Sequence, residues 1–266
     1  MFKRNWREIE PRLEYKGTCY VRDFFRRKDK LSLEGGFKVT EYLEWVRRTT
    51  IPVGKKLLYR KQNLEEALYI LQGEGVIQVG EEKQEIKTWD AVYIPTETPH
   101  TIYSTVENQP LIYMDYAVRT PSDAEEIHVE EASIDKDVTS NVRVGRWTAQ
   151  RAKPGHNGTC STYPIFTREM MQYILFATMM SVPRILGYHR HNTEAIYYVE
   201  SGVGIIKVGG EEVEIRDGDA IYIPNGVAHR CTSTLEDQPL NVFCLGVAIP
   251  YDAQVWTEED LPEAPI

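Results

Sequence analysis

The fold is decided by the stretch EEALYILQGEGVIQVGEEKQEIKTWDAVYIPTETPHTIYS (residues 65–104), which returns as EAIYYVESGVGIIKVGGEEVEIRDGDAIYIPNGVAHRCTS (residues 194–233). The two copies align without a gap at an offset of 129 residues (202 − 73), so that Gly73 falls on Gly202 and His100 on His229. In this window 17 of 40 paired positions are identical. Such self-similarity at one fixed offset indicates an internal duplication.

Each copy reads as a series of short strands. Runs rich in Val, Ile and Tyr are separated by Gly and by EE or DG turns, and a helical period is weak. This pattern predicts an all-β protein with one sandwich or barrel in each half. We expect an N-terminal arm (1–41) that could cover a sheet edge, an N-terminal barrel (42–118), an acidic linker (119–140) and a C-terminal barrel (141–266).

Composition narrows the possible partners and surroundings. The chain has 31 Lys and Arg against 40 Asp and Glu, a net charge of −9, which disfavours nucleic acid and anionic membranes as partners. The basic stretch VRDFFRRKDK (21–30) is interpreted as a solvated arm or subunit contact. No apolar run reaches the ~20 residues of a membrane span, and the N-terminus lacks a signal-peptide core, so a cytoplasmic location is expected.

The histidines indicate a metal site, whereas the cysteines do not. The four cysteines form no CxxC pair and are interpreted as free buried thiols, with Cys231 in the packing although it lies two residues after His229. His189 and His191 form a His-x-His pair, whose rings share one face of a strand. With His229, 38 residues later (229 − 191), they are predicted to bind a metal. His128 and His156 lie in polar connections and are expected to be solvated.

The motifs around these histidines resemble those of the cupin superfamily, and the duplication resembles a bicupin. The second cupin motif is roughly G-x5-P-x-G-x2-H-x3-N, and it is met by Gly218, Pro224, Gly226 and His229, with Ser233 in place of the final Asn. The first is roughly G-x5-H-x-H-x3-E-x6-G, and it is met by His189, His191 and Gly202, with Pro183 in place of the leading Gly. The resemblance implies two tandem jelly rolls with a metal in the C-terminal one only.

The carboxylate of the first cupin motif is missing at its position. Counting seven residues back from Gly202 gives Ala195, whereas Glu194 is one residue early and belongs on the opposite face of a strand. Ala195, Tyr197 and Val199 should then point inward, leaving a three-histidine site. A local bulge that rotates Glu194 inward is the alternative.

The N-terminal copy departs from the motif in the complementary way. It keeps Glu66 and His100, but Arg60 and Gln62 stand where the two histidines would be. Arginine stays protonated and does not ligate a cation. We therefore expect an internal Arg60–Glu66 ion pair in a degenerate jelly roll, which supports the other half or binds a different small molecule.

A three-histidine cupin site resembles those of nonheme iron dioxygenases that cleave β-diketones or oxidise thiols. The resemblance implies an Fe(II) dioxygenase acting on a small chelating or aromatic substrate. Zn, Ni, Mn and Cu are further candidates for the one divalent metal per chain. Tyr197 is the candidate catalytic residue beside the metal, or else a packing residue against Met179 or Met180.

Two other functions stay open at this point. One is a non-oxidative metal enzyme, an isomerase, cyclase or lyase, in which the ion polarises a carbonyl. An oxalate-type decarboxylase is disfavoured, because cupins of that type carry the inward Glu. The other is a non-catalytic bicupin that binds a small molecule. A homodimer is expected, since arms and sheet edges favour association.

Overall fold

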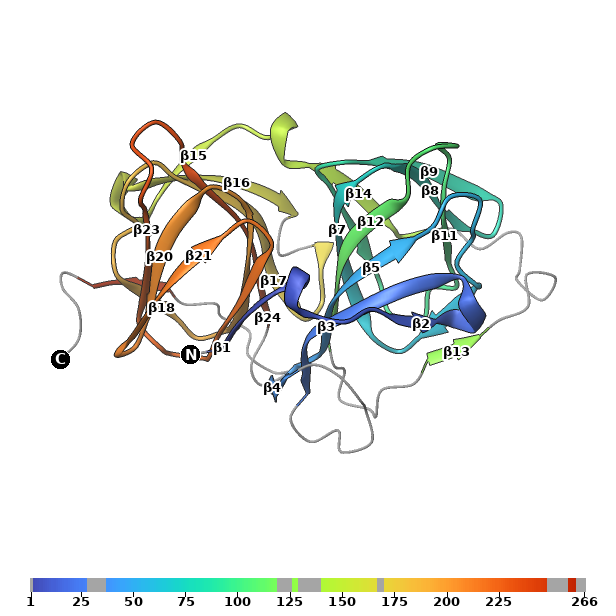
Figure 1. Ribbon diagram of the computed structural model, residues 1–266, viewed down its shortest axis with the longest axis horizontal. Coiled ribbons are helices and arrows are strands. Elements are labelled where there is room, and N and C mark those ends of the chain that lie inside the picture. Colours follow the sequence, from blue (N-terminus) through green and yellow to red (C-terminus); the bar gives the residue numbers. More distant parts are fainter. Residues whose placement is uncertain are drawn as a thin grey trace. The chain divides into compact units, whose positions relative to one another are not determined.

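The computed structural model describes residues 2–27, 37–118, 126–128, 140–166, 170–247 and 258–261, and most of them are strand (Figure 1). The chain divides into two compact units, one of residues 9–146 and one of residues 1–8 with 147–266. The all-β prediction is confirmed. No helix in the described part of the chain is long and apolar enough to cross a membrane.

The N-terminal unit is a jelly roll of two sheets. The larger sheet has the order β14 (Arg143–Arg146), β10 (Asp90–Ile94), β7 (Glu65–Gln72), β12 (Leu111–Val118), β5 (Leu43–Ile51), β3 (Cys19–Arg27) and β2 (Arg12–Glu14), with β4 (Phe37–Thr40) parallel to β3. The facing strands are β11 (Thr101–Ser104), β8 (Glu74–Val79) and β9 (Glu82–Lys87), beside the pair β13 (Glu126–His128) and β6 (Arg60–Gln62).

The C-terminal unit repeats this arrangement. Its larger sheet has the order β1 (Phe2–Asn5), β22 (Asp219–Ile223), β19 (Glu194–Ser201), β24 (Leu240–Val247), β17 (Ile174–Val182), β16 (Cys160–Phe166) and β15 (Lys153–Gly155). The facing sheet has the order β21 (Glu211–Arg216), β20 (Val203–Val208), β23 (His229–Ser233), β18 (His189–His191) and β25 (Glu258–Asp260).

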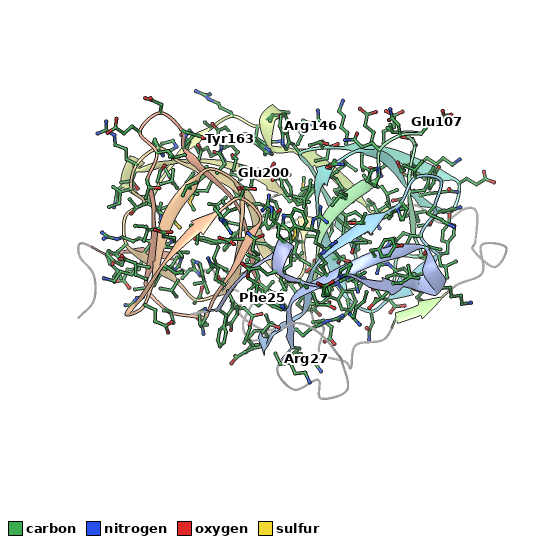
Figure 2. The ribbon with its side chains drawn as sticks, in the orientation of Figure 1. Phe25, Arg27, Glu107, Arg146, Tyr163 and Glu200 are labelled. Atoms are coloured by element: carbon green, nitrogen blue, oxygen red, sulfur yellow. The ribbon has the colours of Figure 1, made fainter. Side chains whose placement is uncertain are left out.

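The core of each unit lies between its two sheets; Figure 2 draws the side chains of the described residues on the ribbon. In the C-terminal unit it joins Ala195, Tyr197 and Val199 of β19 to Ile206 of β20 and Cys231 of β23. The three β19 residues are those that the strand parity placed inside, so that prediction is confirmed. An equivalent cluster fills the N-terminal unit.

The glycines that close the first motif in each repeat are required by the backbone. Gly73 and Gly202 have φ values of 92° and 96°. A Cβ atom at Gly202 would come within 2.8 Å of the Pro239 carbonyl oxygen, and one at Gly73 within 2.6 Å of that of Pro110. Only glycine fits both the left-handed conformation and this close approach.

In each unit, an added strand from outside the repeated segment covers one edge of the large sheet. β1, from the start of the chain, pairs with β22 in the C-terminal unit, and β14 pairs with β10 in the N-terminal unit. Each added strand is held by the same aspartate of the repeat: Asn5 Nδ2 donates to Asp219 Oδ1 at 2.7 Å, and Arg146 Nε to Asp90 Oδ1 at 2.7 Å. The added strand covers an edge that each large sheet would otherwise expose.

The arm of residues 1–41 and the linker of residues 119–140 are thus only partly separate from the jelly rolls. Residues 2–8 of the arm belong to the C-terminal unit and residues 9–27 to the N-terminal one. Most of the linker lies outside the described residues, apart from residue 140 and residues 126–128, which form β13 against β6. Residues 143–146, grouped with the C-terminal barrel from the sequence, pair with β10 instead.

The arm itself is duplicated, at a different offset. The 3-10 turns η2 (Tyr15–Gly17) and η5 (His156–Gly158) each hold three consecutive residues at positive φ: 52°, 54° and 83° in the first, 47°, 56° and 80° in the second. Both run into Gly-Thr-Cys, at residues 17–19 and 158–160. Tyr15 therefore corresponds to His156 at an offset of 141 (156 − 15).

Candidate metal centre

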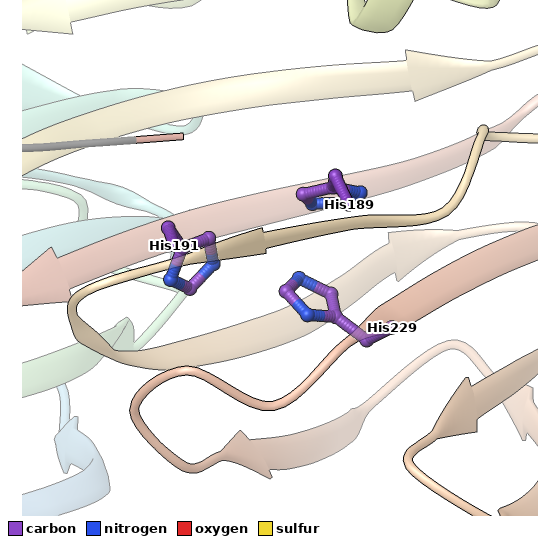
Figure 3. A group of neighbouring side chains, drawn as sticks. All are labelled: His189, His191 and His229. Carbon is purple, nitrogen blue, oxygen red and sulfur yellow. The ribbon is translucent and has the colours of Figure 1, made fainter. Parts of the chain in front are cut away.

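Three histidines converge inside the C-terminal jelly roll (Figure 3). β18 carries His189 and His191 on one face, and His229 begins the neighbouring strand β23, where it pairs with His189. One nitrogen of each ring lies within 4.8 Å of the others. All three side chains are buried. The structure thus brings together the three residues that the sequence predicted as ligands.

Hydrogen bonds turn the rings so that their Nε2 atoms face the common centre. His189 Nδ1 lies 3.1 Å from the Gly187 carbonyl oxygen, and His229 Nδ1 lies 2.8 Å from that of Val227. A carbonyl accepts only, so both Nδ1 atoms are protonated and both Nε2 atoms carry a lone pair. His191 Nδ1 lies 2.6 Å from Thr193 Oγ1, and the buried His191 Nε2 has no hydrogen-bond partner in the part of the chain that the structure describes.

Burial keeps all three rings neutral. Desolvation lowers the pKa of His191 to about 4 and that of His229 to about 3, and it lowers the pKa of His189 furthest. Neutral imidazole is the form that ligates a metal. Three converging Nε2 atoms, one of them a buried acceptor without a partner, therefore fit a divalent cation that prefers nitrogen ligands.

Glu194 is not turned into this centre. The pairing of β19 with β22 and β24 runs without a register shift from Glu194 to Val199, so the bulge considered as an alternative is absent there. Glu194 is buried on the other face of β19, where its Oε2 accepts a hydrogen bond from the Tyr222 hydroxyl at 3.3 Å. Among the described residues, the converging ligand group contains histidines only.

The Tyr197 hydroxyl reaches the centre from β19. It lies 3.3 Å from His189 Nε2 and 3.1 Å from His229 Nε2. The ring of Tyr197 belongs to the same core cluster as Met180, which agrees with the packing interpretation, while a catalytic role of the hydroxyl stays a prediction. A hydroxyl at this place can hydrogen-bond a molecule that approaches the three nitrogens.

A cavity of about 330 Å³ opens beside His189, His191 and Tyr197. The apolar part of its wall consists of Pro164, Phe166, Phe176, Ala177, Met180 and Cys244. Phe176 packs edge-on against the His191 ring, at 5.8 Å between centroids. No Lys, Arg, Asp or Glu is among the described residues that line the cavity, so the described part of its wall carries no such charge.

His156 corrects one expectation from the sequence. We expected a solvated histidine in a polar turn, but His156 is half-buried and lines this cavity. Its ring centroid lies 3.9 Å from that of His189. The prediction of a turn is right for the backbone. The sequence signal that could have placed His156 at the site is the match of GHNGTC (155–160) with EYKGTC (14–19). The side chain of His128 lies outside the described residues.

The cysteines agree with the packing interpretation. All four are free and buried, and Cys231 belongs to the core cluster. Burial raises the pKa of Cys231 to about 12, so its thiol stays protonated. Cys244, which the sequence did not single out, is the cysteine that lines the cavity.

The same place in the N-terminal jelly roll is filled by charged side chains. Arg60 Nη2 lies 2.7 Å from Glu66 Oε1, which confirms the predicted ion pair. Arg60 also donates from Nη1 to the Tyr15 hydroxyl at 2.7 Å and from Nε to His100 Nε2 at 3.3 Å. The guanidinium thus contacts Glu66 and His100, the two residues that this repeat keeps at ligand positions of the motif.

A second arginine completes this charged cluster. Arg47 Nε donates to Asp115 Oδ2 at 2.8 Å, and its Nη2 donates to the Tyr15 hydroxyl at 2.7 Å. Asp115 Oδ1 accepts from Trp45 Nε1 at 2.9 Å. Every member is buried, so the charges are compensated by one another rather than by water.

The sequence of this chain resembles a known family and two proteins of other organisms. The model of the Cupin domain family matches residues 47–116 and 179–246. An uncharacterized protein of Methanocaldococcus jannaschii is 45% identical over 62 residues, 23% of this chain and 49% of that protein. One of Streptomyces coelicolor is 38% identical over 47 residues, 18% of this chain and 45% of that protein. The matches span about half the length of these relatives.

Solved structures resemble the whole chain at low identity. Oxalate decarboxylase of Bacillus subtilis has a TM-score of 0.69 at 16% identity, over 98% of this chain and 79% of that one. Vicilin of hazelnut, Corylus avellana, has a TM-score of 0.69 at 12% identity, over 97% of this chain and 87% of that one. At such identities the likeness concerns the fold.

Proposed function

The chain belongs to the cupin family, as a bicupin with one Cupin domain in each half, and on this premise we propose that it is a nonheme Fe(II) dioxygenase acting on a small chelating or aromatic substrate. His189, His191 and His229 would hold the metal. The single observation that carries the proposal is the convergence of three neutral, buried imidazoles, with no carboxylate of the described residues in their group.

The charge of this ligand set bears on the kind of substrate. Three neutral imidazoles leave the double positive charge of a divalent ion uncompensated, and the cavity wall beside it carries no Asp or Glu among the described residues. A substrate with an anionic chelating group would supply the missing charge. Bound in this way, Fe(II) would supply redox chemistry with O2.

The chain's own residues would orient such a substrate. Phe176 and Met180 offer an apolar wall for an aromatic or aliphatic body and keep water away from it. The Tyr197 hydroxyl, beside two of the ring nitrogens, would hydrogen-bond the polar group of the substrate. Tyr197 is therefore our candidate catalytic residue, since it would touch the reacting end.

The first test is metal content, by mass spectrometry on protein purified anaerobically without a histidine tag. We expect about one iron per chain in the wild type and almost none in the double variant His189→Ala, His191→Ala. Gln62→Ala is the matched control, because Gln62 occupies the position of His191 in the N-terminal repeat (191 − 129). It should leave the iron content unchanged.

Activity and the remaining alternatives follow from the same preparation. Oxygen uptake with a set of catechols, β-diketones and thiols should occur in the wild type and stop in the double variant. One zinc or nickel per chain would redirect the proposal to an isomerase, cyclase or lyase, in which the ion polarises a carbonyl. No metal in either protein, even after metal is offered, would contradict the proposal and favour non-catalytic binding. The homodimer stays a prediction, which light scattering would test.

A further inference from the structure

His156 lies beside His189, on a turn that is hydrogen-bonded to the segment leading into β18. The Thr159 hydroxyl donates to the His156 carbonyl oxygen at 2.8 Å, and the same Oγ1 accepts from the Gly187 amide at 3.2 Å. The Gly187 carbonyl in turn accepts from His189 Nδ1. The arm turn and the first histidine of the His-x-His pair are therefore linked by consecutive hydrogen bonds.

The backbone of this turn is strained at the histidine. His156 and Asn157 have φ values of 47° and 56°, in the left-handed region that most side chains avoid. Such strain persists only where the surrounding structure holds it, and it gathers at functional sites. Here the strain coincides with the placement of a polar ring on the wall of the cavity.

The N-terminal repeat shows what the turn does with its side chain. There Tyr15, at the position of His156, places its hydroxyl 2.7 Å from Arg60 Nη1, and Arg60 occupies the position of His189. In both repeats the arm thus sets a polar ring against the residue at the first ligand position. Tyr15 binds a guanidinium that fills its jelly roll, whereas His156 borders a cavity of about 330 Å³.

The position of His156 differs from that of the three ligands. Its ring packs on the ring of His189, with an interplanar angle of 42°. Among the described residues, the ligand atoms that converge within 4.8 Å of one another belong to the other three histidines. His156 therefore lines the cavity beside His189 without belonging to the converging group.

We propose that His156 is a ligand-binding residue that hydrogen-bonds the anionic group of a small molecule when that group binds at the metal. The inference rests on the proposed function, since it needs a metal held by the three histidines. The chemical class is a small oxygen or nitrogen anion, or the chelating end of a larger substrate. His156 would thus contribute to ligand selection without holding the metal.

The test is azide binding to the cobalt-loaded protein, followed by visible absorption. Three proteins are compared: wild type, His156→Phe and Asn157→Gly. Phenylalanine keeps a planar ring at a position where the other repeat tolerates tyrosine at positive φ. Asn157→Gly is the matched control, because Asn157 belongs to the same turn but is not among the residues that line the cavity.

We expect about one cobalt per chain in all three proteins. Azide should bind about tenfold more weakly to His156→Phe, as expected for the loss of a hydrogen bond to a charged group, and unchanged to Asn157→Gly. Equal azide affinity in wild type and His156→Phe would overturn this inference alone. Loss of cobalt from His156→Phe would show that His156 is a metal ligand, which also overturns it. A wild type that takes no cobalt or iron would instead contradict the proposed function.

Discussion

The two jelly rolls share a backbone plan and differ in what fills it. Where the N-terminal unit has Arg47 and Asp115, the offset of 129 residues places Phe176 and Cys244 in the C-terminal unit. The first pair forms a buried ion pair at 2.8 Å, and the second pair lines the cavity. The same scaffold is therefore filled with charge in one half and left open in the other.

This difference indicates how a duplicated fold can divide its tasks. A metal site needs free lone pairs, so the residues that would satisfy them must be absent. In the N-terminal unit His100 Nε2 receives the Nε–H of Arg60, while its counterpart His229 Nε2 is approached by the Tyr197 hydroxyl. One repeat gains compensated charges and the other gains a place to bind.

The largest effect on this comparison should come from Arg60→Met in the N-terminal unit. Glu66 and Asp115 would lose a buried cation at 2.7 Å and 3.9 Å, and breaking a buried pair in this way costs about 3–5 kcal/mol. Urea unfolding above about pH 8, where Glu66 is ionised, should report that loss in the free energy of unfolding. The double variant Arg60→Met, Glu66→Leu should lose less, since no unpaired glutamate remains. A loss in Arg60→Met below about 1 kcal/mol would mean that the cluster is not the structural element we describe.

A second experiment would try to make the two halves alike. Arg60→His with Gln62→His creates a His-x-His pair in register with Glu66 and His100. We expect no second metal per chain, because the Arg47 guanidinium remains next to the site. Adding Arg47→Phe and Asp115→Cys should raise the content towards two metals per chain, as mass spectrometry would show. A second metal in the first double variant would contradict this view of Arg47.

A third experiment concerns the strand that supports the ligands. β18 pairs with β25 at all three of its residues and with β23 at His189 only. Proline at Glu259 would remove an amide from this edge pairing, and we expect metal affinity to fall by about tenfold, as for other outer supports of ligands. Ile127→Pro on β13, the equivalent strand of the N-terminal unit, should leave metal affinity unchanged. Competition with a chelator would measure both.

The last experiment concerns the pH dependence of unfolding. Burial raises the pKa of Glu66 from 4.5 to about 8, although Arg60 acts to lower it. The folded state therefore keeps a proton that the unfolded chain releases, so this residue lowers stability as pH rises from about 4.5 to about 8. The pKa of Asp115 is shifted in the opposite direction, because Arg47 and Arg60 lower it despite burial. Asp115 therefore adds stability as pH rises, at a lower pH than the window of Glu66. Glu66→Gln should flatten the pH dependence of unfolding in this window, and an unchanged slope would contradict it.

Sequence alone was sufficient for features that depend on spacing. The gapless repeat and the His-x-His pair placed the three histidines together, and strand parity put Ala195 inward and Glu194 outward. His156 was missed because its match to Tyr15 needs an offset of 141, which is 12 more than the rest of the repeat (141 − 129). The size of the cavity depends on which of several strands supply small or apolar side chains, which no local pattern contains.

The added edge strands β1 and β14 limit where the chain can be cut into fragments and when each unit can fold. A fragment of residues 147–266 lacks the strand that covers β22, and a fragment of residues 9–118 lacks the one that covers β10. Each would present a bare edge, open to pairing with another copy. The hydrogen bond between Asn5 and Asp219 joins residues 214 positions apart. During synthesis, β1 can therefore pair with β22 only after most of the chain has been made. Contacts of such separation form slowly, and we expect the half that carries the histidines to finish folding last.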